Sequence, residues 1–150
     1  MGKVLAGFTN GYAGAISRSV DDVVIPLPNS DSSALAFGVP VVYDDSNLGA
    51  VKFTASSTAA DFIGITVRSA SKTPASYGSS LASYASDEMM DVLVRGSTVV
   101  SVSGTPAPGG AVYVVKATGA FSASAGTEGT TVLLTNARFR SAKDSSGRAE

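Results

Sequence analysis

The sequence contains no cysteine, no histidine and no tryptophan. Without cysteine, the chain has no disulfide framework and no thiolate chemistry. Without histidine, Ser-His-Asp and Cys-His catalytic sites are excluded, together with nearly all zinc sites. The lack of tryptophan counts against a sugar-binding surface built from exposed aromatic rings. Only carboxylates, lysines, tyrosines and hydroxyls remain for chemistry, so we expect no catalytic residues, no cofactor and no metal site.

Charge is also scarce, with a net charge of −1 over 150 residues. Such a chain has no general attraction to nucleic acid or to an anionic membrane, so we expect neither as a partner. The apolar run VLAGF after Lys3 is too short for the hydrophobic region of a signal peptide. No stretch reaches the roughly eighteen apolar residues of a membrane span. The sequence therefore predicts a soluble protein without an export signal, and the lack of cysteine fits assembly inside a cell.

What the chain does have is valine, threonine and many small residues. Valine and threonine favour strands, and short apolar runs between glycine, proline and serine turns are typical of all-β sandwiches and barrels. The length suits one domain with a sizeable core. We therefore predict a single-domain β-barrel or jelly-roll-like sandwich over residues 20–150. The expected strands lie within residues 21–28, 35–44, 50–55, 61–69, 90–95, 98–102, 111–123, 130–134 and 137–142.

Two segments break the strand pattern. Residues 1–19 are rich in glycine and alanine and show no clean period, so we expect an extended N-terminal arm with at most a short strand. Residues 69–86 are rich in serine and alanine, and the spacing of Tyr77, Leu81 and Tyr84 allows one or two helical turns. This connection is long for a compact domain, and loops of such length are usually functional or flexible.

Three glycines mark expected turns and bends. Gly96 divides the run MDVLVRGSTVVSV, which predicts a hairpin with a positive φ at this glycine. Gly119 follows Thr118 and predicts a second hairpin within residues 111–123. Gly64 lies inside an alternating strand pattern, where glycine marks a bend or a close approach of another backbone.

Acidic residues occur as two adjacent pairs, Asp21-Asp22 and Asp87-Glu88. Paired carboxylates could serve glycoside hydrolysis. Each pair lies beside a strand start or a turn, however, and we interpret both as ordinary loop chemistry. The segment DDSNLG, residues 44–49, resembles part of a calcium loop but lacks the downstream bidentate glutamate, so a hairpin turn explains it better.

Near the C-terminus, Arg138 and Arg140 share one face of an expected strand, with Phe139 opposite, and two further basic residues, Lys143 and Arg148, follow. The interpretation that we favour is a solvated edge strand, where charge discourages unwanted pairing. The alternative is an electrostatic contact with an acidic protein partner, since arginine is enriched at interfaces.

Aromatic residues in the less regular segments are further candidates for partner contact. Phe8 and Tyr12 lie in an arm that has little else to order it, and large rings bury much area per residue. We therefore favour anchoring of the arm on a neighbouring molecule over packing on its own domain. Tyr77 and Tyr84 are the corresponding candidates in the 69–86 loop.

The segments GYAGAISRS, LAFGVPVVY, FIGITVR, MDVLVRGSTVV, GGAVYVVKATGAF and NARFRSA, followed by GRAE, occur in an order that resembles the capsid cement (decoration) proteins of tailed bacteriophages. The resemblance covers most of the chain and is least marked in residues 44–60 and 69–86. Each segment alone is a common pattern of valines and turn glycines, and the order carries the resemblance.

This resemblance implies a structural virion protein, made in the host cytoplasm, that binds the outer surface of an icosahedral head. It would sit where major capsid protein subunits meet and would reinforce the shell, without enzymatic activity. By their matching positions, Gly11, Tyr12 and Gly14 would belong to a capsid-contacting arm. Gly38, Gly64 and Gly96 would be fold-defining turns and bends. The apolar strand faces and the arm also suit self-association as a dimer or trimer.

Two other classes of function remain open at this point. The first is a β-sandwich binding module or a tail or baseplate component that recognises a glycan or another virion protein. The absence of tryptophan and the presence of only five tyrosines count against the glycan form. The second is an enzyme that uses carboxylates or a lysine, and a pocket holding two acids with strongly shifted pKa values would favour it. We rank this class last.

Overall fold

The computed structural model describes residues 10–44, 48–69, 72 and 83–150, and the structural statements below concern these residues. Within them the protein consists of β-strands, turns and loops, without a helix. The predicted all-β class is therefore confirmed. No helix of the described residues is long and apolar enough to span a membrane.

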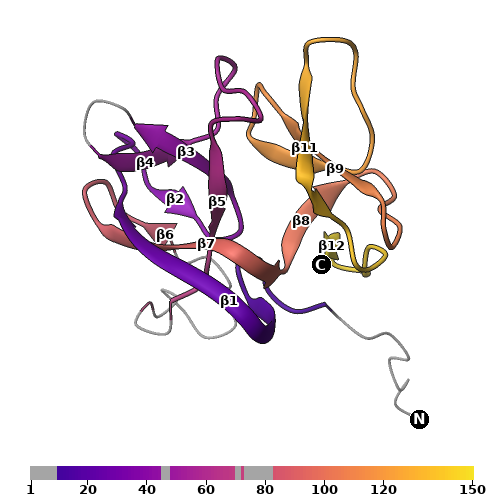
Figure 1. The fold of residues 1–150 in the computed structure, drawn as a ribbon, viewed down its shortest axis with the longest axis horizontal. Helices are drawn as coiled ribbons and strands as arrows, with labels where there is room; N and C mark the ends of the chain where they lie inside the picture. The colour runs from indigo at the N-terminus through magenta and orange to yellow at the C-terminus, as the bar shows by residue number, and fades with distance from the viewer. Residues whose placement is uncertain (1–9, 45–47, 70–71, 73–82) are drawn as a thin grey trace.

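The first half of the chain forms a five-stranded antiparallel sheet in the order β1-β7-β5-β3-β4 (Figure 1). β1 is an edge strand, which explains how it accommodates two prolines near its end. Just after β1, Asn29 forms a bridge with Ala50 of β4, so the sheet curls back towards its first strand without closing into a barrel. The strands are β1 (Ile16–Pro28), β3 (Pro40–Asp44), β4 (Gly49–Lys52), β5 (Phe62–Thr66) and β7 (Met89–Thr98), with a short separate pair β2 (Leu35–Ala36) and β6 (Ser83–Tyr84).

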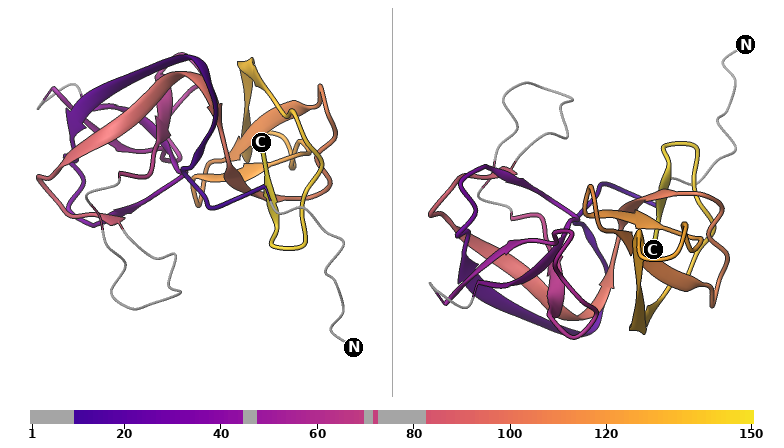
Figure 2. Two further views of the ribbon diagram at one scale, coloured as in Figure 1. Left: turned by 90° about the horizontal axis from the view of Figure 1, so that it is seen from below. Right: turned by 90° about the horizontal axis from the view of Figure 1, so that it is seen from above.

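The second half forms another five-stranded sheet in the order β11-β9-β10-β8-β12. Its pairs are antiparallel except for β8 and β10, which run parallel. Figures 1 and 2 show the two sheets as neighbouring lobes, which we call the N-terminal lobe (residues 16–98) and the C-terminal lobe (residues 100–150). The open sheets fit the sandwich form of the prediction. The strands are β8 (Val100–Ser103), β9 (Ala111–Val115), β10 (Ala120–Ser122), β11 (Thr131–Arg138) and β12 (Arg148–Ala149).

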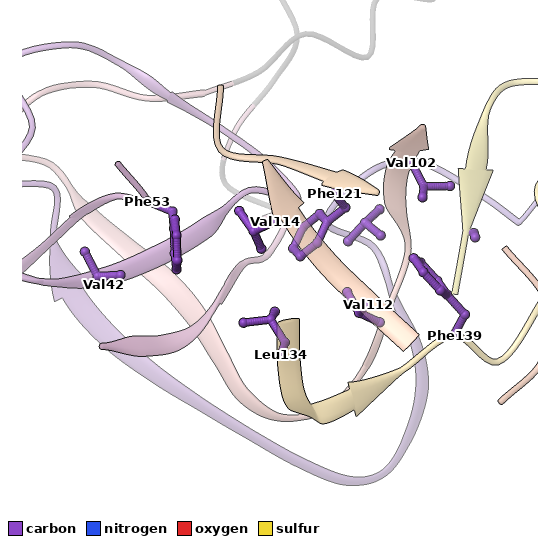
Figure 3. Packing of buried hydrophobic residues seen from close by; sticks show 10 residues of the cluster. Val42, Phe53, Val102, Val112, Val114, Phe121, Leu134 and Phe139 are labelled. Carbon is purple, nitrogen blue, oxygen red and sulfur yellow. The ribbon is translucent and has the colours of Figure 1, made fainter. Parts of the chain in front are cut away.

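The largest buried cluster joins the two lobes. Val42 and Phe53 of the N-terminal lobe pack in one cluster with Val114, Phe121 and Leu134 of the C-terminal lobe (Figure 3). A second cluster lies within the N-terminal lobe and includes Leu35, Val41, Met90 and Val92. Burying one such side chain contributes about 1.5–3 kcal/mol, so the shared cluster couples the stability of the two sheets.

The hairpin predicted at Gly96 is wrong. β7 runs through Gly96 to Thr98, and the chain continues through Val99 into β8 of the other sheet. The valine-rich run is apolar on both faces because it passes between two lobes, not because it folds back on itself. Gly96 does have a positive φ of 133°, but at a bulge, where the register of β1 against β7 shifts between Arg18 and Val23.

Other turn predictions agree with the structure. β9 and β10 form the hairpin expected around Gly119, which has a φ of 65°. β3 and β4 form the hairpin expected at residues 44–49, with Asp44 opposite Gly49. β1 begins at Ile16, inside the segment predicted as an arm, and the division of the chain after residue 19 stays a prediction. The helical turns predicted within residues 69–86 fall mainly on residues 73–82, which lie outside the described residues.

Candidate partner-contact surface

The described end of the N-terminal arm, residues 10–15, lies in the seam between the two lobes. The Gly14 amide donates to the Val99 carbonyl (2.8 Å), and the Val99 amide donates to the Ala15 carbonyl (2.9 Å). The Arg68 amide, just after β5, donates to the Gly14 carbonyl (2.7 Å). The described end of the arm therefore contacts both the segment after β5 and the passage from β7 to β8.

The C-terminal lobe holds the same segment through Asp144 and Arg148. The Asn10 amide donates to the Asp144 carboxylate (2.8 Å), and the Arg148 guanidinium donates to the Gly11 carbonyl (2.7 Å). The Asn10 side-chain amide donates to the Arg148 carbonyl (2.8 Å). Because these bonds join residues more than 130 positions apart, the root of the arm is fixed by the fold and not by its own sequence.

The Asp144 carboxylate is organised to remain ionised. Burial raises the pKa of this carboxyl, but the backbone amides of Arg148, Asn10 and Ser146 donate to it, and the Arg148 charge lies nearby. The net result is a pKa for Asp144 below its ordinary value. The anchor of the arm is thus a charged one at neutral pH.

Tyr12 presents its ring at this seam. The Arg68 guanidinium lies 5.2 Å and the Arg148 guanidinium 5.3 Å from the centroid of the ring, so one arginine from each lobe contacts it. Each cation–π contact contributes about 0.5–1 kcal/mol at an exposed position. Tyr12 nevertheless remains 52% exposed, which leaves part of its surface open to solvent.

Tyr84 requires a correction, since the structure places it in the core. It is 1% exposed, its hydroxyl donates to the Val67 carbonyl (2.8 Å), and its ring packs edge-on against Phe37. Burial raises the pKa of this phenol, which fits its role as a hydrogen-bond donor. Tyr84 lies in β6, which pairs with β2, and its ring belongs to the core. It is therefore not a contact residue. Phe8 and Tyr77 lie outside the described residues.

Gly38 and Gly64 both allow close approach of another backbone. Gly38 has a φ of 74°, and a Cβ there would lie 2.8 Å from the Gly14 nitrogen. A Cβ on Gly64 would collide with the Leu93 carbonyl of β7. The close backbone approach expected at Gly64 is therefore present, and Gly38 positions the root of the arm.

Arg138 and Arg140 point outward around Phe139, which is 2% exposed. Arg138 ends the edge strand β11, and its guanidinium donates to the carbonyl of Ala137 (2.8 Å). Neither arginine forms an ion pair with a carboxylate of the described residues. The alternation predicted for this strand is present, and both charges remain available.

Asp21, Asp87 and Glu88 serve local structure, whereas one oxygen of the Asp22 carboxylate is buried without a hydrogen-bond partner among the described residues. Asp21 pairs with Arg95, and Glu88 pairs with Lys72 and accepts a hydrogen bond from the Ala85 amide (2.8 Å). Asp87 has a φ of 62° in the turn before β7. In the described part of the chain, no three acidic residues gather in a group that could hold a metal ion.

Asn29 is a structural residue that sequence reasoning missed. It is fully buried, its side-chain amide donates to the carbonyls of Ser33, Tyr84 and Ala85, and its side-chain oxygen accepts from the Asp31 amide. Asn29 thereby joins the end of β1 to the turn that precedes β7. An asparagine directly after Pro28 reads as a turn residue, and nothing local signals its distant partners.

Comparison with known proteins gives one family and one fold. Residues 3–150 match the model of a family described as "Structural cement protein (E217 gp24/Pam3 gp6)". A chain in the solved capsid of Myoviridae phage XM1 is similar in structure, with a TM-score of 0.75 and 18% identity. The similarity covers 98% of this chain and 92% of the XM1 chain. No curated protein matches the sequence.

Proposed function

Since this chain belongs to the family of phage structural cement proteins, we propose that it binds the outer surface of an icosahedral phage head and reinforces contacts between major capsid protein subunits. The observation that carries the proposal is the family match, which spans nearly the whole chain. The fold shared with a chain of a phage capsid supports it.

The proposed contact surface comprises the arm and its surroundings together with the basic end of β11. Tyr12 offers an exposed ring at a fixed point between the lobes, and Arg138 and Arg140 offer two charges outside any ion pair of the described residues. Phe8 and Tyr77 complete the proposed set on the basis of the sequence. A rigid body that holds such groups in place loses little conformational entropy on binding.

We also propose that the protein acts as a dimer or trimer and without catalysis, cofactor or nucleic acid. Linked copies bind a symmetric shell at several points, and each further contact is then intramolecular, which raises the overall affinity. The low net charge and the local ion pairs of Asp21 and Glu88 support a function based on contact surface.

The test is co-sedimentation of the purified full-length protein with phage heads that lack it. We expect saturable binding at a fixed ratio to the major capsid protein and greater resistance of the heads to heat. Tyr12→Ala should weaken binding by roughly tenfold, the effect of losing one aromatic anchor. Tyr43→Ala is the matched control, because Tyr43 is similarly exposed (54%) but lies on β3, away from the arm. Absence of binding by the unmodified protein would overturn the proposal.

A further inference from the structure

A groove of about 420 Å³ lies between the two lobes. One wall is formed by six consecutive residues of β7, from Leu93 to Thr98, and the other by residues 136–140 at and just after the end of β11. The floor consists of side chains from the shared core, among them Phe121 and Leu134 (Figure 3). The volume lies within the range of ordinary binding pockets.

The β7 wall exposes a strand edge to the groove. Side chains of a strand alternate between its two faces, so consecutive residues line one groove partly through their main chain, here around the bulge at Gly96. β7 pairs with β5 at Val92 and Leu93, and in the described residues no pairing with β5 continues from Val94 onward. The β11 wall offers fewer main-chain groups, because the Phe139 amide and carbonyl bond to Gly110 and Gly109, and the Arg140 amide donates to the Glu150 carbonyl.

The accessible part of the floor is apolar. Phe62, Ile65 and Ala137 line the groove and are only partly buried, and Val94 of the β7 wall beside them is 45% exposed. An unpaired strand edge beside apolar side chains is the arrangement by which proteins bind an extended peptide as an added strand. The groove therefore has the features of a site for an extended protein segment rather than for a small polar ligand.

The charged residues around the groove indicate which kind of protein segment can bind there. Of the charged residues that line it, Arg95 pairs with Asp21, and Glu150 pairs with Arg18. Arg138 and Arg140 form no ion pair within the described residues, although the Arg140 charge also acts on the nearby Glu150 carboxylate. Three arginines and one carboxylate line the groove, which leaves an excess of positive charge there. An acidic segment complements these charges, whereas the N-terminal segment of a second copy, whose only charged side chain before residue 10 is Lys3, does not.

We infer that the groove between the lobes binds an extended segment of the capsid shell protein in which apolar and acidic residues alternate. This inference rests on the proposed function and names the part of the partner that is bound. The apolar side chains of the segment face the floor, its carboxylates contact Arg138 and Arg140, and its main chain pairs with the free edge of β7.

The experiment uses the full-length protein and heads that lack it, with two readouts. The first is the affinity of the double variant Arg138→Glu and Arg140→Glu. Its matched control is Lys52→Glu with Lys116→Glu, which changes the net charge equally at two lysines that do not line the groove. The second is photo-cross-linking from Asn136→p-benzoylphenylalanine in the groove, compared with Ala125→p-benzoylphenylalanine outside it, and mass spectrometry of the products. Circular dichroism melting curves check that all variants are folded.

We expect the Arg138/Arg140 variant to bind heads at least about tenfold more weakly and the lysine control to bind within about twofold of the unmodified protein. Cross-links from position 136 should map to an acidic, extended segment of the shell protein, and position 125 should give none to that segment. Equal binding by the arginine variant, or cross-links from position 136 to a second copy, overturns the inference. Equal binding would also remove Arg138 and Arg140 from the proposed contact surface, but the proposed binding to heads would stand. Absence of head binding by the unmodified protein overturns both.

Discussion

Gly14 and Gly38 lie backbone against backbone, at the place where the arm crosses the N-terminal lobe. A Cβ on Gly14 would lie 3.0 Å from the Gly38 nitrogen, and a Cβ on Gly38 would lie 2.8 Å from the Gly14 nitrogen. Both residues also have positive φ values, 77° and 74°. This contact holds Gly14 within hydrogen-bonding distance of the Val99 carbonyl and the Arg68 amide.

Gly38→Ala should lower the free energy of unfolding by about 2 to 4 kcal/mol, since the methyl group adds a steric overlap to the strain of a positive φ. Urea denaturation measures this change. Gly109→Ala is the matched control, because Gly109 has a φ of 80° but no heavy atom within 4 Å of the point that a Cβ would occupy. It should cost about 1 kcal/mol from φ alone. Equal effects of the two substitutions would show that the Gly14–Gly38 approach is not tight.

Asn29→Ala should lower the free energy of unfolding by about 2 to 4 kcal/mol. The substitution removes an amide that donates to three carbonyls around a buried position and an oxygen that accepts from the Asp31 amide. Ser86→Ala is the control in the same region, because the exposed Ser86 hydroxyl makes a single bond to the Asp31 carbonyl (2.7 Å) and should contribute less than about 1 kcal/mol. A loss below that of the control would mean that solvent replaces the Asn29 bonds.

The comparison of Gly119 with Gly96 shows which features are predictable from sequence. The Gly119 hairpin joins neighbouring strands of one sheet, so local turn chemistry predicts it correctly. At Gly96 the same local pattern is present, but the second run pairs with strands β10 and β12, which lie later in the chain. Pairing between distant segments leaves no local signal, so the bulge and the passage between lobes are not predictable.

In the candidate contact surface, too, features that depend on local sequence are predictable and features that depend on distant contacts are not. The outward direction of Arg138 and Arg140 follows from strand alternation around the apolar Phe139, and the sequence predicts it. The anchoring of Asn10 by Asp144 and the contact of Tyr12 with two arginines depend on residues far apart in sequence. The prediction for Tyr84 is wrong because an aromatic residue in a serine-rich segment looks exposed until β6 is seen to pair with β2.

Tyr84→Phe should lower the free energy of unfolding by about 1 to 2 kcal/mol, because the Val67 carbonyl loses a buried donor while the ring and its packing on Phe37 remain. Binding to heads should be unchanged, since the ring is not on the surface. Tyr43→Phe, on the exposed tyrosine of β3, should change stability by less than about 0.5 kcal/mol. Reduced head binding by folded Tyr84→Phe would restore Tyr84 as a contact residue.

Acid should release the arm from the C-terminal lobe. The pKa of Asp144 is lower in the folded protein than its ordinary value, so its carboxylate stabilises the folded state at any pH above the unfolded pKa of about 4. This contribution declines as the pH falls below about 4 and is lost once the pH has passed through the lower pKa of the folded state. The Asn10 amide donates to this carboxylate. Its protection factor against hydrogen exchange should therefore be lower at pH 3 than at pH 6.

Hydrogen exchange measured by NMR at pH 6, 4 and 3 tests this, with protection factors calculated at each pH to remove the intrinsic dependence. Asp144→Asn provides the control, because the amide oxygen still accepts a hydrogen bond but does not titrate. In that variant the Asn10 protection factor should be lower at pH 6 and nearly constant down to pH 3. Burial raises the pKa of Glu150, but the hydrogen bonds from Arg18 and Ser17 and the arginine charges lower it overall. We expect Glu150 to titrate alike in both proteins, so a difference between them reports on Asp144. A parallel loss of protection in both proteins would assign the acid effect to Glu150 or to the fold as a whole, against an anchoring role of the Asp144 charge.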